Sequence, residues 1–425
     1  MGCELSAGGA AIVVVGAGPQ ALCLCAQLLR KRPRWRRHLR VIDPAGGWLS
    51  CWRRQMEGLE VPMLRSPAPH HPHPNPNALR DYAHGRGRGH QLHGPFGQPH
   101  TGLFSDFCQQ LIDSEDLAGL VHPGQVRELR LAACRGGPLE LSLASGERLQ
   151  ARHLVLACGP GEPSWPAWTL DLPPLHPPAA LQHSRTLNLP ALGRLDGQRV
   201  LVVGGGLTSG HLALGALERG ATVELLCRRR LRVQPFDSDP GWLGPKRLKA
   251  FAAEPSWQRR RELVRQARGG GSLTAEVRHR LEQARRGGRL RLHEQGEVRQ
   301  LRWRGSHWQV ACSDGSSLAV ERIWLATGHQ QGVSHQPLLR QLQRQRPLQL
   351  VDDWPVLSPE LGWGGAGVSV MGGLSALQLG PAAANIHGGR EGARRITADL
   401  LHRCPPAAAT LLGSGAESLR AAPER

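Results

Sequence analysis

The chain has 425 residues, of which 40% are hydrophobic, and this length and composition exclude a disordered chain and allow two or three domains. The formal net charge is +19, but the basic residues are almost all arginines in scattered clusters, so we expect solvated faces and no nucleic-acid partner. No apolar run approaches the roughly 20 residues that span a bilayer. Ten cysteines without a C-x-x-C pair indicate a reduced, cytoplasmic protein.

The first glycine turn follows an apolar strand predicted at residues 12–15 and begins a helix. In its sequence, GAGPQA, Gly16 makes the tight turn, and Gly18 lets the backbone approach a pyrophosphate. Ala21 permits close packing of the helix on the strand. The next strand ends at Asp43, where a carboxylate can bind the hydroxyls of a ribose. This combination predicts a dinucleotide site.

A proline-, histidine- and glycine-rich stretch occupies residues 61–100, and its proline spacing predicts a loop. The HHPHP run within it lacks helical spacing and contains no cysteine or carboxylate, so we expect no metal site. A loop that is exposed to solvent or covers a cofactor is the interpretation that fits this composition. A helix is predicted after it, around residues 102–112.

A weak internal repeat organises the rest of the chain. Residues 122–159 and residues 293–328 each form the pattern of a strand–turn–strand meander that closes on an apolar strand and a small-residue turn with glycine. Each copy follows one glycine turn, which indicates a duplicated dinucleotide-binding unit. The predicted fold class is therefore α/β, with two Rossmann-like dinucleotide-binding domains that each carry a β-meander insertion.

The second glycine turn, GGGLTSG, follows an apolar run at residues 200–203. Gly204 and Gly206 take the places of the first two glycines of the first turn. Ser209 and Gly210 are small enough to keep the following helix close to its strand. We therefore expect a second phosphate-binding turn of the same type.

The strand after this second turn ends in VELLCRRR, with Cys227 and arginines where the first unit has an acid. A carboxylate repels the 2′-phosphate of NADPH, whereas a guanidinium binds it with two parallel hydrogen bonds. We expect this site to prefer NADPH to NADH, with Arg228 or Arg229 as the clamp. The alternative that these arginines are only surface charges stays open.

Two dinucleotide sites in one chain are explained most simply by a resident flavin and a visiting nicotinamide, with hydride passing where the domains meet. FAD is expected in the first site and NADPH in the second. The predicted boundaries are 1–165 for the first part of the FAD-binding domain, 166–196 for a linker, 197–325 for the NADPH-binding domain, 326–404 for the closing part of the FAD-binding domain, and 405–425 for a loose tail.

These segments together resemble the two-dinucleotide-binding-domain flavoproteins, and within them the flavin-dependent monooxygenases of the lysine/ornithine N-hydroxylase branch. Besides the two glycine turns, GGWLSCW at residues 46–52 is similar to their Gly-Gly-x-Trp segment. Thr327 and Gly328 belong to an Ala-Thr-Gly that looks like their linker, and His183 begins a His-Ser similar to the end of their signature before the second turn. The missing redox cysteine pair argues against the disulfide reductases of the superfamily.

The resemblance also implies which residues lie beside the cofactors. By their places in the matching motifs, these are Trp48, Trp52, Arg65, Thr327, Gly328 and Asn385. Many relatives carry a Gly-Asp near the C-terminus, with the Asp on the ribityl chain of the flavin. Here Gly372 and Gly373 stand in that stretch, so the carboxylate contact is lost or replaced, and Gly373 is taken as a cofactor-binding residue. The N-hydroxylases keep a glutamine and a lysine after the tryptophan segment, where this chain has no lysine.

The predicted function is that of an FAD- and NADPH-dependent oxidoreductase, in particular a flavin monooxygenase that passes one oxygen atom from a flavin hydroperoxide to a small nucleophile such as an amine. O2 and a small-molecule substrate are the expected partners. No side chain is singled out as a catalytic acid or base, because the protein supplies position, hydrogen bonds and exclusion of water. Two alternatives stay open: an NADPH-dependent flavin reductase or oxidase without oxygen transfer, and a non-catalytic FAD-binding regulatory protein.

Overall fold

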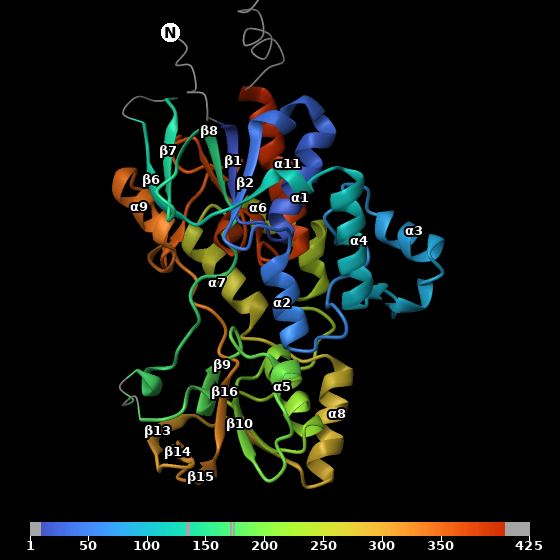
Figure 1. The fold of residues 1–425 in the computed structure, drawn as a ribbon, viewed down its shortest axis with the longest axis vertical. Helices are drawn as coiled ribbons and strands as arrows, with labels where there is room; N and C mark the ends of the chain where they lie inside the picture. The colour runs from blue at the N-terminus through green and yellow to red at the C-terminus, as the bar shows by residue number, and fades with distance from the viewer. Residues whose placement is uncertain (1–9, 133–136, 171, 173–174, 404–425) are drawn as a thin grey trace, which may run out of the picture.

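The computed structural model describes residues 10–132, 137–170, 172 and 175–403. Figure 1 shows two units stacked along the long axis of the molecule, each built around its own sheet. We call them the first and the second unit, in the order of their glycine turns. The expected loose tail, residues 405–425, lies outside the described residues.

The first unit is built on a mixed sheet that has seven strands among the described residues. β1 lies at its centre because its run of alanine, isoleucine and valine suits a strand buried on both faces. Val14 pairs in parallel with Val41 on one side and with Val155 on the other. The strands are β1 (Ala10–Val15), β2 (Leu39–Asp43), β5 (Val121–Pro123), β6 (Val126–Arg130), β7 (Leu139–Leu143), β8 (Arg148–Leu156) and β19 (Val368–Val370), in the order β5-β2-β1-β8-β7-β6 with β19 on β8.

Helices of the first unit cover this sheet and extend toward the second unit (Figure 1). They are α1 (Pro19–Lys31), α2 (Ser50–Gly58), α3 (Ala78–Gly85), α4 (Thr101–Ser114), α9 (Pro337–Gln345), α10 (Ala376–Leu379) and α11 (Ile386–Arg403). α1 packs along α11, and glycines such as Gly389 let the two helices approach closely. Two short hairpins complete the unit, β3 (Leu92–His93) with β4 (Gln98–Pro99) and β17 (Leu350–Val351) with β18 (Trp354–Pro355).

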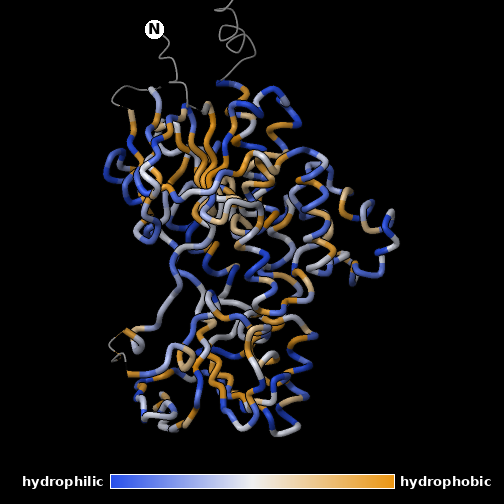
Figure 2. The backbone as a smooth tube through the Cα atoms, in the orientation of Figure 1, coloured by the Kyte–Doolittle hydropathy of each residue, from blue (hydrophilic) through white to orange (hydrophobic). Residues whose placement is uncertain are grey.

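The second unit has a parallel five-stranded sheet among the described residues, in the order β12-β11-β10-β16-β9. Its strands are β9 (Leu181–His183), β10 (Arg199–Val203), β11 (Thr222–Cys227), β12 (Leu290–Glu294) and β16 (Arg322–Leu325). α5 (Leu207–Glu218) and α8 (Ala275–Arg286) pack together beside it. The meander forms a separate antiparallel sheet of β13 (Val298–Trp303), β14 (Trp308–Cys312) and β15 (Ser317–Val320). Figure 2 shows the apolar strands concentrated at the centre of each unit.

A helical excursion, residues 237–270, leaves the second unit after β11 and returns before α8. It contains α6 (Pro245–Ala253) and α7 (Trp257–Arg268). Phe251 and Val264 from these helices belong to the hydrophobic core of the first unit. Arg260, although only 8% exposed, donates a hydrogen bond to the carbonyl of Leu377 in that unit. Residues that follow the second glycine turn in the chain are therefore part of the packing of the first unit.

The predicted α/β fold with two Rossmann-like units, each followed by a meander, is confirmed. The stretch at residues 61–100 is not wholly a loop, because α3 forms there. No proline stands between Pro76 and Pro95, and α3 starts two residues after Pro76, where no proline blocks helical hydrogen bonds. Within the expected linker, Leu181–His183 forms β9 at the edge of the second sheet. The two meanders also differ, since the first continues the main sheet through β8 and the second is a sheet of its own.

Candidate functional site

The first glycine turn brings the end of β1 against the chain that leaves β8. Gly16 has a φ of +100°, and a Cβ there would overlap the carbonyl oxygen of Ala157. Its N–H donates to the carbonyl of Ile42 at 2.8 Å, which ties the turn to β2. Gly18 is the N-cap of α1, offers no side-chain cap, and has open space where a Cβ would stand. Ala21 is fully buried between helix and sheet, as the predicted close packing requires.

Asp43, at the end of β2, is held by the backbone of the turn. One carboxylate oxygen accepts a hydrogen bond from the N–H of Ala17 at 2.9 Å, and the other accepts one from the N–H of Ala45 at 2.9 Å. Each oxygen retains a further lone pair. The acid is thus oriented beside the glycine turn, where a ribose would meet it.

The segment at residues 46–52 is bonded to this turn, since the N–H of Leu49 donates to the carbonyl of Ala17 at 2.8 Å. Trp48 is buried, and its indole N–H donates to the carbonyl of Leu117 at 2.9 Å. Trp52 packs against Phe104, with ring centroids 5.4 Å apart. Both tryptophans therefore pack in or against the core of the first unit, and their contact with a flavin stays a prediction.

The closing part of the chain reaches the first turn through Gln20, a residue of the GAGPQA motif to which we assigned no role. Its side-chain amide donates to the carbonyls of Ala383 and Asn385, at 2.9 and 3.3 Å. Its carbonyl oxygen, Oε1, is buried without a partner and lies 3.8 Å from the place of a Cβ on Gly372. Next to it, a Cβ on Gly373 would lie 3.5 to 3.6 Å from the amide of a neighbouring glutamine, Gln331. A polar side chain inside a glycine motif is the signal that could have identified Gln20.

The second glycine turn repeats this construction in the second unit. Gly204 has a φ of +148°, and a Cβ there would stand 2.6 Å from the carbonyl oxygen of Ala326. The N–H of Gly204 donates to the carbonyl of Leu226 at 2.9 Å, as Gly16 does in the first unit. Gly206 is the N-cap of α5 and offers no side-chain cap.

The two small residues of the second motif allow tight packing of α5. The Ser209 hydroxyl donates to the carbonyl of Gly206 at 2.6 Å and so points back into its own helix. A Cβ on Gly210 would lie 2.5 Å from Val277 of α8 and 3.0 Å from Leu273. These positions therefore bring α5 close to α8.

The end of β11 has no carboxylate. Cys227 is buried, and its thiol donates a weak hydrogen bond to the carbonyl of His293 at 3.7 Å. Arg228 and Arg229 are exposed, and Arg229 donates to the carbonyl of Gly269 at 2.9 Å. Both cations follow β11 at the place where the first unit has Asp43. Their role as a clamp on a 2′-phosphate stays a prediction.

The Ala-Thr-Gly and His-Ser segments meet where the chain crosses between the units. The Thr327 hydroxyl donates to the carbonyl of Ser164 at 2.5 Å. The carbonyl of Gly328 accepts from the N–H of Ser164 at 2.9 Å and lies 3.1 Å from Nε2 of His183, which is fully buried. The outgoing and returning connections are thereby bonded to each other.

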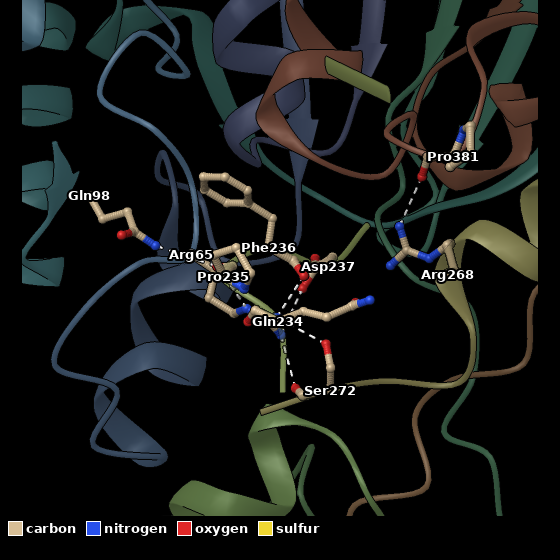
Figure 3. A network of polar contacts seen from close by, with 9 residues as sticks. All are labelled: Arg65, Gln98, Gln234, Pro235, Phe236, Asp237, Arg268, Ser272 and Pro381. Atoms are coloured by element: carbon tan, nitrogen blue, oxygen red, sulfur yellow. Dashed lines mark hydrogen bonds and ion pairs between the residues drawn. The ribbon is translucent and has the colours of Figure 1, made fainter. Parts of the chain in front are cut away.

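Segments that follow the carboxyl ends of β2 and β9 are in contact where the two units meet, since the Gln55 amide of α2 donates to the carbonyl of Ser184 at 3.1 Å. A second contact between the units joins Glu60, just after α2, to Arg219 at the end of α5, at 2.7 Å. Arg65 crosses the same boundary (Figure 3), and its guanidinium is fully engaged there. Its hydrogen bonds are made to backbone carbonyls near residues 234 and 272, and its expected contact with an isoalloxazine ring stays a prediction.

Comparisons with known proteins agree with this geometry. A family model described as FAD-NAD(P)-binding matches residues 13–161. A second model, described as L-lysine 6-monooxygenase/L-ornithine 5-monooxygenase, matches residues 104–331, which is more than half of the chain. The chain belongs to the L-lysine 6-monooxygenase/L-ornithine 5-monooxygenase family. The predicted class of FAD- and NADPH-dependent flavin monooxygenases is confirmed by this membership.

Solved structures of similar fold include several amine-hydroxylating monooxygenases. An ornithine N-hydroxylase from Kutzneria sp. 744 has a TM-score of 0.76 at 16% identity, over 93% of this chain and 99% of that one. A cadaverine monooxygenase from Erwinia amylovora has a TM-score of 0.74 at 15% identity, over 98% and 100%. An L-lysine 6-monooxygenase from Pseudomonas syringae has a TM-score of 0.72 at 19% identity, over 92% and 99%. No curated protein sequence matches the chain.

The residues at the first turn fit the FAD that this family binds. The N-terminus of α1 is uncapped and has no acidic residue in its first turn, so its N–H groups and positive dipole end are available to a pyrophosphate. Gly18 leaves room for that group, Asp43 is fixed beside the turn by the N–H of Ala17, and Oε1 of Gln20 is a buried acceptor that still needs a donor.

Metal ligands, the HHPHP run and the length of the helices bear on what else the molecule binds. Across the described residues, no three His, Cys, Asp or Glu side chains gather closely enough to hold a metal ion. In the HHPHP run, His71 is buried against Phe107 and lies 3.2 Å from the carbonyl of Pro76, so it serves the packing of the loop. None of the helices that the structure describes is long and apolar enough to cross a membrane.

Proposed function

We propose that this member of the family hydroxylates a primary amine of a small molecule, with FAD held at the first glycine turn and NADPH bound at the second. The observation that carries the proposal is the pair of equivalent glycine turns, Gly16 on Ala157 and Gly204 on Ala326, in units that are in contact through segments that follow their strands. Ornithine, lysine and cadaverine, the substrates in the names of similar proteins, are the first amines to examine.

The chain's own part in this reaction is binding, orientation and exclusion of water. Bound FAD supplies the two-electron and oxygen chemistry that no side chain offers. Gly16 and Gly18 admit the pyrophosphate, Asp43 orients the adenosine ribose, and Gln20 offers an acceptor to a hydroxyl or N–H of the cofactor. We place Arg228 and Arg229 on the 2′-phosphate of NADPH.

A reducing compartment suits this assignment. The cysteines that the structure describes are all free thiols, and five of the seven are buried. We therefore propose a cytoplasmic enzyme, with O2 and a small amine as its partners.

The test uses the purified protein with its bound flavin. The protein is expected to be yellow and to lose that colour faster with NADPH than with NADH. With at least one of ornithine, lysine and cadaverine, it is expected to form a hydroxylamine in step with NADPH consumption. If NADPH is consumed but every amine gives only hydrogen peroxide, the chain is a reductase or oxidase without oxygen transfer. A colourless protein that binds no added FAD would be a non-catalytic member.

A further inference from the structure

Arg65 is a first-unit side chain buried in the second unit. It follows α2, and its side chain is only 9% exposed. One terminal nitrogen donates to the carbonyls of Gln234 and Phe236, both at 2.7 Å, and the other donates to the carbonyl of Ser272 at 2.9 Å (Figure 3). The Ser272 hydroxyl lies 3.0 Å from the guanidinium, and Asp237 pairs with it at 3.4 Å.

These acceptors lie in the two chain segments through which the helical excursion leaves and re-enters the second unit. We call them the neck, residues 232–236 and 271–273. The segments are bonded to each other, since Leu273 donates to the carbonyl of Arg232 at 2.8 Å and accepts from the N–H of Gln234 at 2.9 Å. Arg65 therefore holds both segments of the neck from the side of the first unit.

The neck continues directly into contact with the second glycine turn. A Cβ on Gly271 would lie 3.0 Å from the Cα of Gly206, so the two backbones touch. On the other side of this contact, Arg268 at the end of α7 donates to the carbonyl of Pro381 in the first unit at 3.0 Å (Figure 3). The glycine run that packs on the second turn is thus tied to the first unit at both of its ends.

We propose that Arg65 is a positioning residue, which holds the second glycine turn in place relative to the first unit through the neck at residues 232–236 and 271–273. The inference rests on the proposed function, in which hydride passes between the ligands of the two turns. Such a transfer requires the two turns to be correctly placed relative to each other. A misplacement of about 1 Å between reacting groups lowers a rate on the order of 100-fold.

The chemistry of the contact requires arginine. A planar guanidinium offers five N–H donors in a fixed fork and can reach several carbonyls from one position. A lysine carries the same charge on three donors around one nitrogen and cannot span both segments of the neck in the same way. Methionine retains much of the apolar length and offers no donor.

The test compares Arg65→Met and Arg65→Lys with Arg80→Met, a change at an exposed arginine of α3. In Arg65→Met, FAD affinity and flavin reduction by dithionite are expected to match the wild type. The limiting rate of flavin reduction by NADPH is expected to fall on the order of 100-fold, with little change in the NADPH concentration for half-saturation. Amide hydrogen exchange is expected to accelerate at the neck, residues 232–236 and 271–273. Arg65→Lys is expected to show a reduction rate between those of the wild type and Arg65→Met. Arg80→Met is expected to behave as the wild type.

Two results would overturn the proposal. One is an Arg65→Met protein that NADPH reduces at the wild-type rate. The other is a variant that loses FAD binding, dithionite reduction and thermal stability together, which would make Arg65 a general folding residue. If dithionite reduces the wild-type flavin and NADPH does not, the proposed function fails. Hydrogen exchange then decides alone: acceleration confined to the neck supports the positioning role, and unchanged exchange overturns it.

Discussion

The two glycine turns of this molecule share one construction. In each, the first glycine donates its N–H to the end of the next strand, Gly16 to Ile42 and Gly204 to Leu226. In each, the carbonyl oxygen of an alanine beyond the neighbouring strand lies too close to admit a Cβ on the glycine. The same backbone solution thus serves both sites, as expected for a duplicated unit.

The turns differ in what surrounds them. The first is completed by its own strand, because Asp43 accepts hydrogen bonds from Ala17 and Ala45. The second has no such acid and is contacted instead by Gly271, on a run tied to the other unit. The first turn is thus completed within its own unit, whereas the second is contacted by a run that is also bonded to the first unit.

The largest effect is expected from Gly16→Ala. The side chain would overlap the carbonyl of Ala157 and adopt a φ of +100°, and such strain costs about 1–3 kcal/mol before the overlap is counted. With the overlap, FAD affinity is expected to fall on the order of 100-fold or more, measured by titrating the apoprotein. Gly146→Ala is the matched control, since its φ is +90° and nothing lies within 4 Å. Equal losses in both variants would contradict a local role for Gly16.

Gly204→Ala tests the second turn by the same logic. The new Cβ would stand 2.6 Å from the carbonyl oxygen of Ala326. The protein is expected to keep its FAD and to lose reduction by NADPH, followed anaerobically by the colour of the flavin. Gly197→Ala, at φ +74° in open space before β10, controls for backbone strain. Loss of FAD from Gly204→Ala alone would show that the two turns are not independent.

Smaller effects are expected from the arginines after β11. Removing a charge-assisted hydrogen bond costs about 1.5–3 kcal/mol, so Arg229→Ala or Arg228→Ala should raise the Michaelis constant for NADPH about tenfold or more. The constant for NADH should not change, because NADH has no 2′-phosphate. Arg230→Ala, in the exposed neighbour, serves as the control. A variant that weakens NADH and NADPH alike would show that these arginines are not the clamp.

A fall in pH is expected to destabilise the first unit through His70 and His71. Burial is the main cause that lowers the pKa of His71 to about 3 and that of His70 to about 4. Both rings therefore stay neutral in the folded protein, whereas an unfolded chain binds their protons below a pH of about 6.5. Above that pH these histidines do not lower the free energy of unfolding. Below it, the free energy of unfolding falls toward pH 4 by up to about 1.4 kcal/mol per pH unit for each histidine.

Thermal melting between about pH 7.5 and about pH 5 measures this effect. His71→Gln should reduce the slope by the share of one histidine. His402→Gln, at an exposed histidine near the end of α11, is the control and should leave the slope unchanged. The same slope in His71→Gln as in the wild type would show that His71 is not a source of the pH dependence.

Local patterns predicted a large part of the first site. The strand, glycine turn, helix and acid of residues 12–43 form one contiguous βαβ segment, so their geometry follows from short-range rules. Arg65 shows the limit. Its partners lie near residues 234 and 272, and no local pattern indicates which distant carbonyls a long side chain will reach.

The sequence by itself determined the two glycine turns, the repeat that places a meander after each, and the cofactor class, because glycine freedom and strand periodicity act within a few residues of each other. The tertiary structure alone decided that α6 and α7 pack on the first unit, that Gln20 reaches Asn385, and that Arg65 holds the neck. These contacts depend on the packing of segments far apart in the chain, which is settled only when both units are folded and joined.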